Sequence, residues 1–178
     1  MTRTLLIAAA VLSLAACATA QPSAPAPSPG VGTLEGWAAG NTRYLVVNGA
    51  RRGWSTTESG LQYRRVGRAH PNGRQPVATD TVKVHYRGTF VDGREFDSSW
   101  SRNEPTEFPL NRVIRGWTKG VALMREGETF EFVIPAALGY GERWVGGDEL
   151  PPGSTLLFTV ELLEVKPRPV AIPRQPSP

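Results

Sequence analysis

Beyond Gly60, hydrophobic and polar positions follow the pattern of β-strands. Five segments rich in branched and aromatic residues are separated by turn-forming residues, and this pattern predicts strands. The predicted bounds are 61–66, 81–90, 107–110, 128–134 and 155–165. The Asp92-Gly93 pair predicts a hairpin turn between Phe90 and Phe96, because glycine accepts the positive φ that such turns require.

One segment has the spacing of a helix instead. Its apolar residues recur at helical intervals: Val113, Ile114, Trp117, Val121 and Met124. Gly127 follows them, and helices commonly end on a left-handed glycine. One short helix and about five antiparallel strands predict an α+β domain in which the sheet curls over the helix.

The chain begins with the pattern of an export signal. A positive charge at Arg3 precedes an apolar stretch from Leu5 to Ala16, which is too short to span a bilayer as a permanent anchor. Two cleavage sites follow and predict opposite destinations. Residues 14–17, Leu-Ala-Ala-Cys, resemble the lipobox of bacterial lipoproteins, whereas residues 18–20, Ala-Thr-Ala, form an A-x-A site that would release a soluble protein.

We favour the lipobox because Cys17 is the only cysteine in the chain and stands where a thiol would receive diacylglycerol. The protein would then be a lipoprotein of the cell envelope that faces the periplasm, since several acyl chains anchor a protein stably in a membrane. Ala18 replaces the aspartate that commonly retains lipoproteins at the inner membrane, which favours the outer membrane. Cleavage after Ala20 would instead give a secreted soluble form.

The chain divides by composition into five predicted parts. The parts are a signal peptide (1–16), a disordered Pro/Ala/Ser tether (17–32), a short extension (33–58), the folded domain (59–166) and a Pro-rich tail (167–178). The extension contains a candidate amphipathic helix that Trp54 could pack onto the domain. The tail is expected to trail from the domain, with a partner ligand as the alternative.

Composition limits the chemistry that the chain can carry. Its 178 residues are 40% hydrophobic and 20% charged, which suits one globular domain. The net charge of +4 comes from Lys and Arg residues scattered among Asp and Glu, so we expect no nucleic-acid partner. His70 and His85 are the only histidines, which disfavours a zinc site of the usual ligand type. We therefore predict neither a metal nor a cofactor.

Aromatic and branched residues are dense near the turns of the predicted fold. They are Tyr86, Phe96, Phe108, Val113, Ile114, Trp117, Tyr140 and Phe158. Any one of them would suit a hydrophobic core. A core does not require tyrosine hydroxyls beside a carboxylate such as Asp97, so the combination indicates a concave apolar site with few polar groups.

Five segments of the chain, in this order, resemble the signature of the FKBP family. They are Val84-His85-Tyr86-Arg87-Gly88, Asp92-Gly93-Arg94-Glu95-Phe96-Asp97-Ser98-Ser99, Val113-Ile114-Arg115-Gly116-Trp117, Gly139-Tyr140-Gly141 and Leu150-Pro151-Pro152-Gly153-Ser154-Thr155-Leu156. The resemblance covers about residues 59–165, and residues 57–63 also look like the lead-in of the exported bacterial branch. It implies an FKBP-like fold and peptidyl-prolyl cis-trans isomerase activity, without a cofactor.

The resemblance also implies roles for individual residues. The catalytic set would be Tyr86, Phe96, Asp97, Trp117, Tyr140 and Phe158, and the substrate-binding set Phe108, Val113, Ile114 and Leu150. In the family the substrate proline lies on the indole that matches Trp117. The Ile114 backbone N–H and the Tyr140 hydroxyl match donors to substrate carbonyls, and Asp97 matches the carboxylate beside the twisting bond.

Departures from the family pattern qualify these implications. Thr106 stands where well-known members carry a further aromatic, so affinity for macrolides such as rapamycin is expected to be reduced. Trp144 is either a lid that touches substrate or a packing residue. Arg102 matches a position that pairs with Asp97. The long helical dimerisation arm of one branch of the family does not fit within residues 34–60, so we expect a monomer.

The sequence is compatible with three classes of function. The first is an isomerase that acts on proline-containing client polypeptides. The second is a binding module or chaperone that holds proline-containing segments without turnover. The third is a structural envelope lipoprotein, in which the cavity would be filled by the protein's own side chains.

Overall fold

A computed structural model describes residues 33–146 and 149–168 of the chain. The predicted signal peptide, the Cys17 lipidation site, the tether and most of the Pro-rich tail lie outside the described residues. Within the described residues, no helix combines the length and the apolar character needed to cross a membrane.

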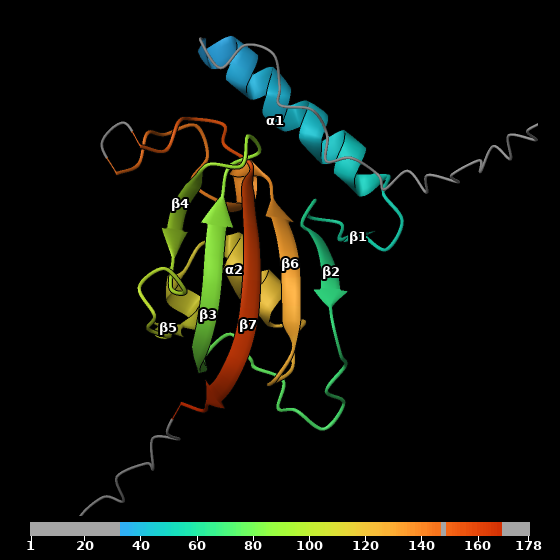
Figure 1. Cartoon of the computed structure of the whole chain (residues 1–178), viewed down its shortest axis with the longest axis vertical. Coiled ribbons are helices and arrows are strands. Elements are labelled where there is room, and N and C mark those ends of the chain that lie inside the picture. The colour runs from blue at the N-terminus through green and yellow to red at the C-terminus, as the bar shows by residue number, and fades with distance from the viewer. Residues whose placement is uncertain (1–32, 147–148, 169–178) are drawn as a thin grey trace, which may run out of the picture.

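A seven-stranded antiparallel sheet forms the body of the domain (Figure 1). Its strands are β1 (Ser55–Thr56), β2 (Gln62–Val66), β3 (Thr81–Thr89), β4 (Glu95–Ser98), β5 (Thr106–Pro109), β6 (Thr129–Ile134) and β7 (Leu156–Lys166). The strand order is β1-β2-β6-β7-β3-β4, and β5 pairs with the part of β3 that β4 leaves free. The five predicted strands are confirmed. The two additional strands, β1 and β4, are too short to show an alternating pattern.

Alternation along β3 decides which side chains face the core. Val82, Val84, Tyr86 and Gly88 are buried, whereas the residues between them are more exposed. Since successive side chains of a strand point to opposite faces, these four lie on the same face of the sheet. Tyr86 is thereby placed on the face that also carries the core.

Helix α2 (Arg115–Val121) lies against one face of the sheet (Figure 1). A 3₁₀ turn, η1 (Leu110–Arg112), leads into it, and a second, η2 (Ala136–Leu138), follows β6. Two side chains of α2, Trp117 and Val121, are buried in the core. The predicted helix is confirmed but is shorter than expected. Gly127 does have a φ of +86°, yet it lies in the turn before β6 and does not cap the helix.

Helix α1 (Leu34–Gly49) lies across one end of the sheet (Figure 1). It begins at Thr33, whose Oγ1 accepts a hydrogen bond from Gly36 N at 3.1 Å, as an N-cap residue does. The extension therefore contains a helix, as expected. Its buried face holds Trp37, Gly40, Asn41 and Asn48, whereas Val46 is 71% exposed. Polar residues thus replace the apolar stripe that the sequence suggested.

Trp54 follows α1 in the chain and packs differently from the prediction. It is only half-buried, and the guanidinium of Arg64 on β2 lies over its ring at 5.1 Å. Trp37 is the more deeply buried of the two, at 6% exposed. The main aromatic contact between the helix and the domain is therefore made by Trp37.

Candidate active site

An open cavity of about 340 Å³ lies beside α2. Its lining consists of Tyr86, Phe96, Asp97, Phe108, Arg112, Val113, Ile114, Trp117, Tyr140 and Phe158. The fold therefore brings together nine of the ten residues predicted for catalysis and substrate binding. Leu150 is the exception, because it does not line the cavity.

Trp117 is fixed by three aromatic neighbours. Its ring centroid lies 5.4 Å from that of Tyr86, 5.5 Å from that of Phe108 and 5.3 Å from that of Phe158. The interplanar angles are 86°, 77° and 88°, which is the edge-to-face arrangement that aromatic quadrupoles favour. At 4% exposed, the indole has little room to change its orientation.

Gly88 on β3 allows two walls of the cavity to meet. A Cβ at this position would lie 2.6 Å from the Phe96 ring and 2.9 Å from the Phe158 ring. Without one, the Phe96 and Phe158 centroids approach to 5.6 Å, with an interplanar angle of 88°. A glycine is needed here for close packing, because any larger side chain would occupy the space that the two rings fill.

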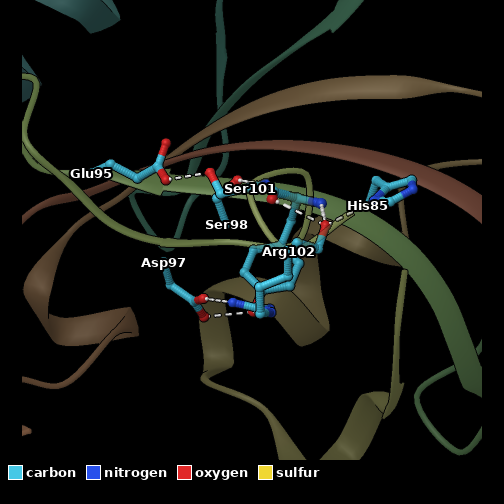
Figure 2. Close-up of polar contacts among 8 residues, drawn as sticks. His85, Glu95, Asp97, Ser98, Ser101 and Arg102 are labelled. Atoms are coloured by element: carbon cyan, nitrogen blue, oxygen red, sulfur yellow. Dashed lines mark hydrogen bonds and ion pairs between the residues drawn. The ribbon is translucent and has the colours of Figure 1, made fainter. Parts of the chain in front are cut away.

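Asp97 provides the carboxylate of the cavity and has two donors. The Tyr86 hydroxyl donates to its Oδ2 at 2.5 Å, and Arg102 Nη1 donates to its Oδ1 at 2.5 Å. Arg102 Nη2 also donates to the Tyr86 hydroxyl oxygen at 3.0 Å. Figure 2 shows Asp97 and Arg102 pointing toward one another. The expected pair is present, and the phenol completes a closed group of three.

These contacts set the charge states of the group. Burial raises the pKa of Asp97, but the hydrogen bonds from Tyr86 and Arg102 and the charge of Arg102 outweigh it, so the pKa lies below the ordinary value of 3.8. Burial, followed by the hydrogen bond to Asp97, raises the pKa of Tyr86 above 10.0. At neutral pH the carboxylate is therefore ionised and the phenol remains a donor.

Ser99 anchors the backbone of Tyr86. Its Oγ accepts from Tyr86 N at 2.7 Å and lies 3.0 Å from His85 Nδ1. The His85 ring stacks on Trp100 at 5.5 Å, with an interplanar angle of 12°. Trp100, at 40% exposed, thus covers a histidine outside the cavity. Trp144 does not line the cavity either and is 46% exposed, so it is neither a wall of the cavity nor part of the core.

Tyr140 and Ile114 supply the remaining polar groups expected from the sequence. Tyr140 is half-buried, and burial, followed by the charge of Asp97, raises its pKa above 10.0, so its hydroxyl is protonated at neutral pH. Ile114 is the residue that precedes α2. The first N–H groups of a helix have no partner within it, and the Ile114 N–H is one of these groups at α2.

Arg112 is the lining residue that the sequence analysis missed. It ends the 3₁₀ turn directly before Val113 and is exposed. Its position directly before the predicted substrate-binding residues Val113 and Ile114 was the available signal. Arg112 places a cation beside walls that are otherwise mostly aromatic and aliphatic.

A model of the FKBP-type peptidyl-prolyl cis-trans isomerase family matches residues 72–163. The chain belongs to this family. The FKBP-type isomerase FkpA of Aeromonas hydrophila is 50% identical over 125 residues, which are 69% of this chain and 44% of that protein. The outer membrane protein MIP of Legionella longbeachae is 41% identical over 123 residues, which are 69% of this chain and 52% of that protein.

The crystal structure of FkpA from Escherichia coli has the same fold. It superposes with a TM-score of 0.69 and 43% identity, over 76% of this chain and 64% of that one. The chain thus spans about half the length of the curated relatives that it matches. The FKBP-like fold expected from the sequence is confirmed.

Proposed function

We propose that the protein is a peptidyl-prolyl cis-trans isomerase that rotates X-Pro bonds in unfolded or exported polypeptides. The observation that carries the proposal is the open cavity of about 340 Å³ with the Trp117 indole in its lining and the Tyr86–Asp97–Arg102 group beside it. Membership in the FKBP-type family supports the same activity. The open cavity also argues against a purely structural protein, in which side chains would fill it.

The reaction needs no acid, base or metal. Rotation about a peptide bond is opposed by a barrier of about 18–20 kcal/mol that comes from amide resonance. Resonance separates charge between the carbonyl oxygen and the nitrogen, so an apolar cavity favours the twisted amide over the planar forms. A site that fits the twisted geometry better than either planar isomer lowers the barrier, and each tenfold gain in rate requires about 1.4 kcal/mol.

Each polar group has a role in this scheme. The proline ring lies on Trp117, between the walls formed by Phe96 and Phe158. The Ile114 N–H and the Tyr140 hydroxyl hold carbonyl groups of the client on either side of the bond. Asp97 remains ionised in its group of three and interacts with the amide as it twists. No cofactor takes part.

A protease-coupled assay tests the activity. The protein without residues 1–20 is added to a short X-Pro-Phe peptide with chymotrypsin, which cleaves only the trans form, and the slow phase is timed. We expect acceleration that rapamycin inhibits only weakly, because Thr106 stands where well-known members of the family carry a further aromatic. Trp117→Ala should abolish it, whereas Trp144→Ala, a tryptophan outside the cavity, should retain it. Peptide binding without acceleration would identify a binding module instead.

We further propose that the protein is a monomeric lipoprotein of the cell envelope, anchored through Cys17 and facing the periplasm. The apolar segment and the Leu-Ala-Ala-Cys sequence support export and lipidation. The name of the relative MIP, an outer membrane protein, is consistent with the outer membrane. The packing of α1 against its own domain supports a monomer, because this helix does not project as an arm.

A further inference from the structure

Helix α1 contacts two segments that in turn contact walls of the cavity, although no residue of α1 lines it. The first contact runs through aromatic rings. Trp37 meets Phe90 edge-to-face at 5.6 Å, and Phe90 meets the cavity residue Phe96 at 4.9 Å. The guanidinium of Arg94 lies over the rings of both Trp37 and Phe90, at 5.7 Å and 5.0 Å. The helix therefore supports Phe96 from behind.

The second contact is a set of buried hydrogen bonds to the turn before β7. Trp37 Nε1 donates to Ser154 Oγ at 3.1 Å, and Ser154 Oγ donates to Pro151 O at 2.6 Å. Thr155 N donates to Asn41 Oδ1 at 2.6 Å. Asn41, Ser154 and Thr155 are at most 2% exposed. Removing one partner of such a bond would leave the other buried and unsatisfied, which costs more than a solvent-exposed hydrogen bond is worth.

The same turn is attached to the segment that carries Tyr140. Gly153 N donates to Gly141 O at 3.0 Å, and Gly141 directly follows Tyr140. The other half of the helix is held separately. Asn48 Nδ2 donates to Gln62 Oε1 at 2.8 Å, and Gln62 Nε2 donates to Leu45 O at 2.8 Å. The helix is thus fixed to β2 at one end, and at the other it is linked to Phe96 through Phe90 and to the Tyr140 segment through the turn before β7.

We propose that Trp37 is a positioning residue for the isomerase reaction, because it holds Phe96 and the Tyr140 segment at a fixed separation. This inference rests on the proposed function. Preferential binding of a twisted bond requires walls that do not adapt to the planar isomers. Small displacements of positioning groups lower rates strongly. The extension is therefore a working part of the catalytic domain, although it lies outside the matched residues 72–163.

Steady-state kinetics of helix variants test the proposal. Trp37→Ala removes both contacts and should lower kcat/KM about tenfold. Trp37→Phe keeps a ring but removes the Nε1 donor, as Ser154→Ala removes its acceptor, and each should lower kcat/KM about threefold. The loss should appear in kcat more than in KM, because Trp117 still receives the proline ring. Val46→Ala, on the exposed face of the same helix, should match the wild type.

Two further measurements separate positioning from a general loss of stability. All variants are compared at a temperature at which near-ultraviolet circular dichroism shows them folded. Ser154→Ala removes both the Trp37–Ser154 and the Ser154–Pro151 hydrogen bonds, whereas Trp37→Phe removes only the first. The kcat/KM of the Trp37→Phe/Ser154→Ala double variant should therefore be no lower than that of Ser154→Ala alone. If the kcat/KM losses of the two single variants multiply in the double variant, the inference is wrong.

The proposal also has outcomes that do not depend on the alanine variant folding. If the kcat/KM of Trp37→Phe and that of Ser154→Ala each stay within about 1.5-fold of the wild-type value, the change is well below the effect of one lost hydrogen bond. The positioning role is then wrong, and the isomerase function stands. If the wild type itself fails to accelerate isomerisation, the proposed function is wrong.

Discussion

The Tyr86 hydroxyl donates to Oδ2 of Asp97 at 2.5 Å, so a hydrogen bond joins a residue of β3 to a residue of β4 at the wall of the cavity. Arg102 donates to the other carboxylate oxygen. The carboxylate is thus held in one orientation from two sides. The geometry and the charge state of this group depend on each other, which makes pH a useful probe.

The first prediction concerns stability in acid. The pKa of Asp97 in the folded protein lies below its ordinary value of 3.8. The ionised form therefore stabilises the fold above about pH 4, and this contribution is lost as the pH falls through the lowered pKa. The free energy of unfolding of Asp97→Asn should lie below that of the wild type at neutral pH, and the two should converge in acid.

Denaturant titrations between about pH 7 and pH 2.5 measure this convergence. The effect should be modest, because the Asp97 side chain is 41% exposed and water screens its charge. A difference between the two proteins that stays constant over the whole range would show that the charge of Asp97 does not contribute.

The second prediction concerns the contact between Phe96 and Phe158. Gly88→Ala places a methyl group where both rings already lie, so at least one wall must move. We expect a loss of about 1–3 kcal/mol in the free energy of unfolding and a fall of about tenfold in kcat/KM. Gly93→Asn, at the open hairpin turn with a φ of +88°, is the control, since asparagine tolerates this conformation. Full activity in the folded Gly88→Ala protein would contradict the account of the wall.

The third prediction concerns client preference. Arg112 is an exposed cation in the cavity lining, so peptides with Glu next to the proline should react faster than peptides with Lys there. The ratio should be about twofold to fivefold, as for exposed charge pairs, and should shrink as salt is added. Arg112→Glu should reverse the preference.

Lys119→Glu is the matched control for this reversal. It makes the same change in net charge from a position on α2 that does not line the cavity. If both variants shift the preference equally, the overall charge of the protein and not Arg112 sets it.

The fourth prediction concerns the anchor. Cys17→Ser removes the thiol that would carry the lipid, so the protein should move from the membrane fraction to the soluble fraction and lose labelling by radioactive palmitate. Isomerase activity per molecule should be unchanged, because residues 17–32 precede the folded domain. Membrane association that persists in the variant would favour a different mode of attachment.

The sequence by itself determined five of the seven strands and most of the cavity. Enrichment in branched and aromatic residues located five strands, because the preference of these residues for strands is a local property. The Asp92-Gly93 turn is also local, and Gly93 has the positive φ that was expected. Nine cavity residues followed from the family resemblance, since its motifs place them at matching positions.

Only the tertiary structure decided how α1 packs, which residue supports Phe96, and that Arg112 lines the cavity. The Trp37–Ser154 and Asn41–Thr155 hydrogen bonds join residues that are 117 and 114 positions apart. A hydrophobicity pattern predicts that asparagines are exposed to solvent. It cannot indicate that these asparagines are buried, because their hydrogen-bond partners lie far away in the sequence. Leu150 was assigned to the site on its motif, but in the folded chain it does not line the cavity. Local periodicity fixes which face of an element is buried, whereas long-range polar contacts exist only after the chain has closed on itself.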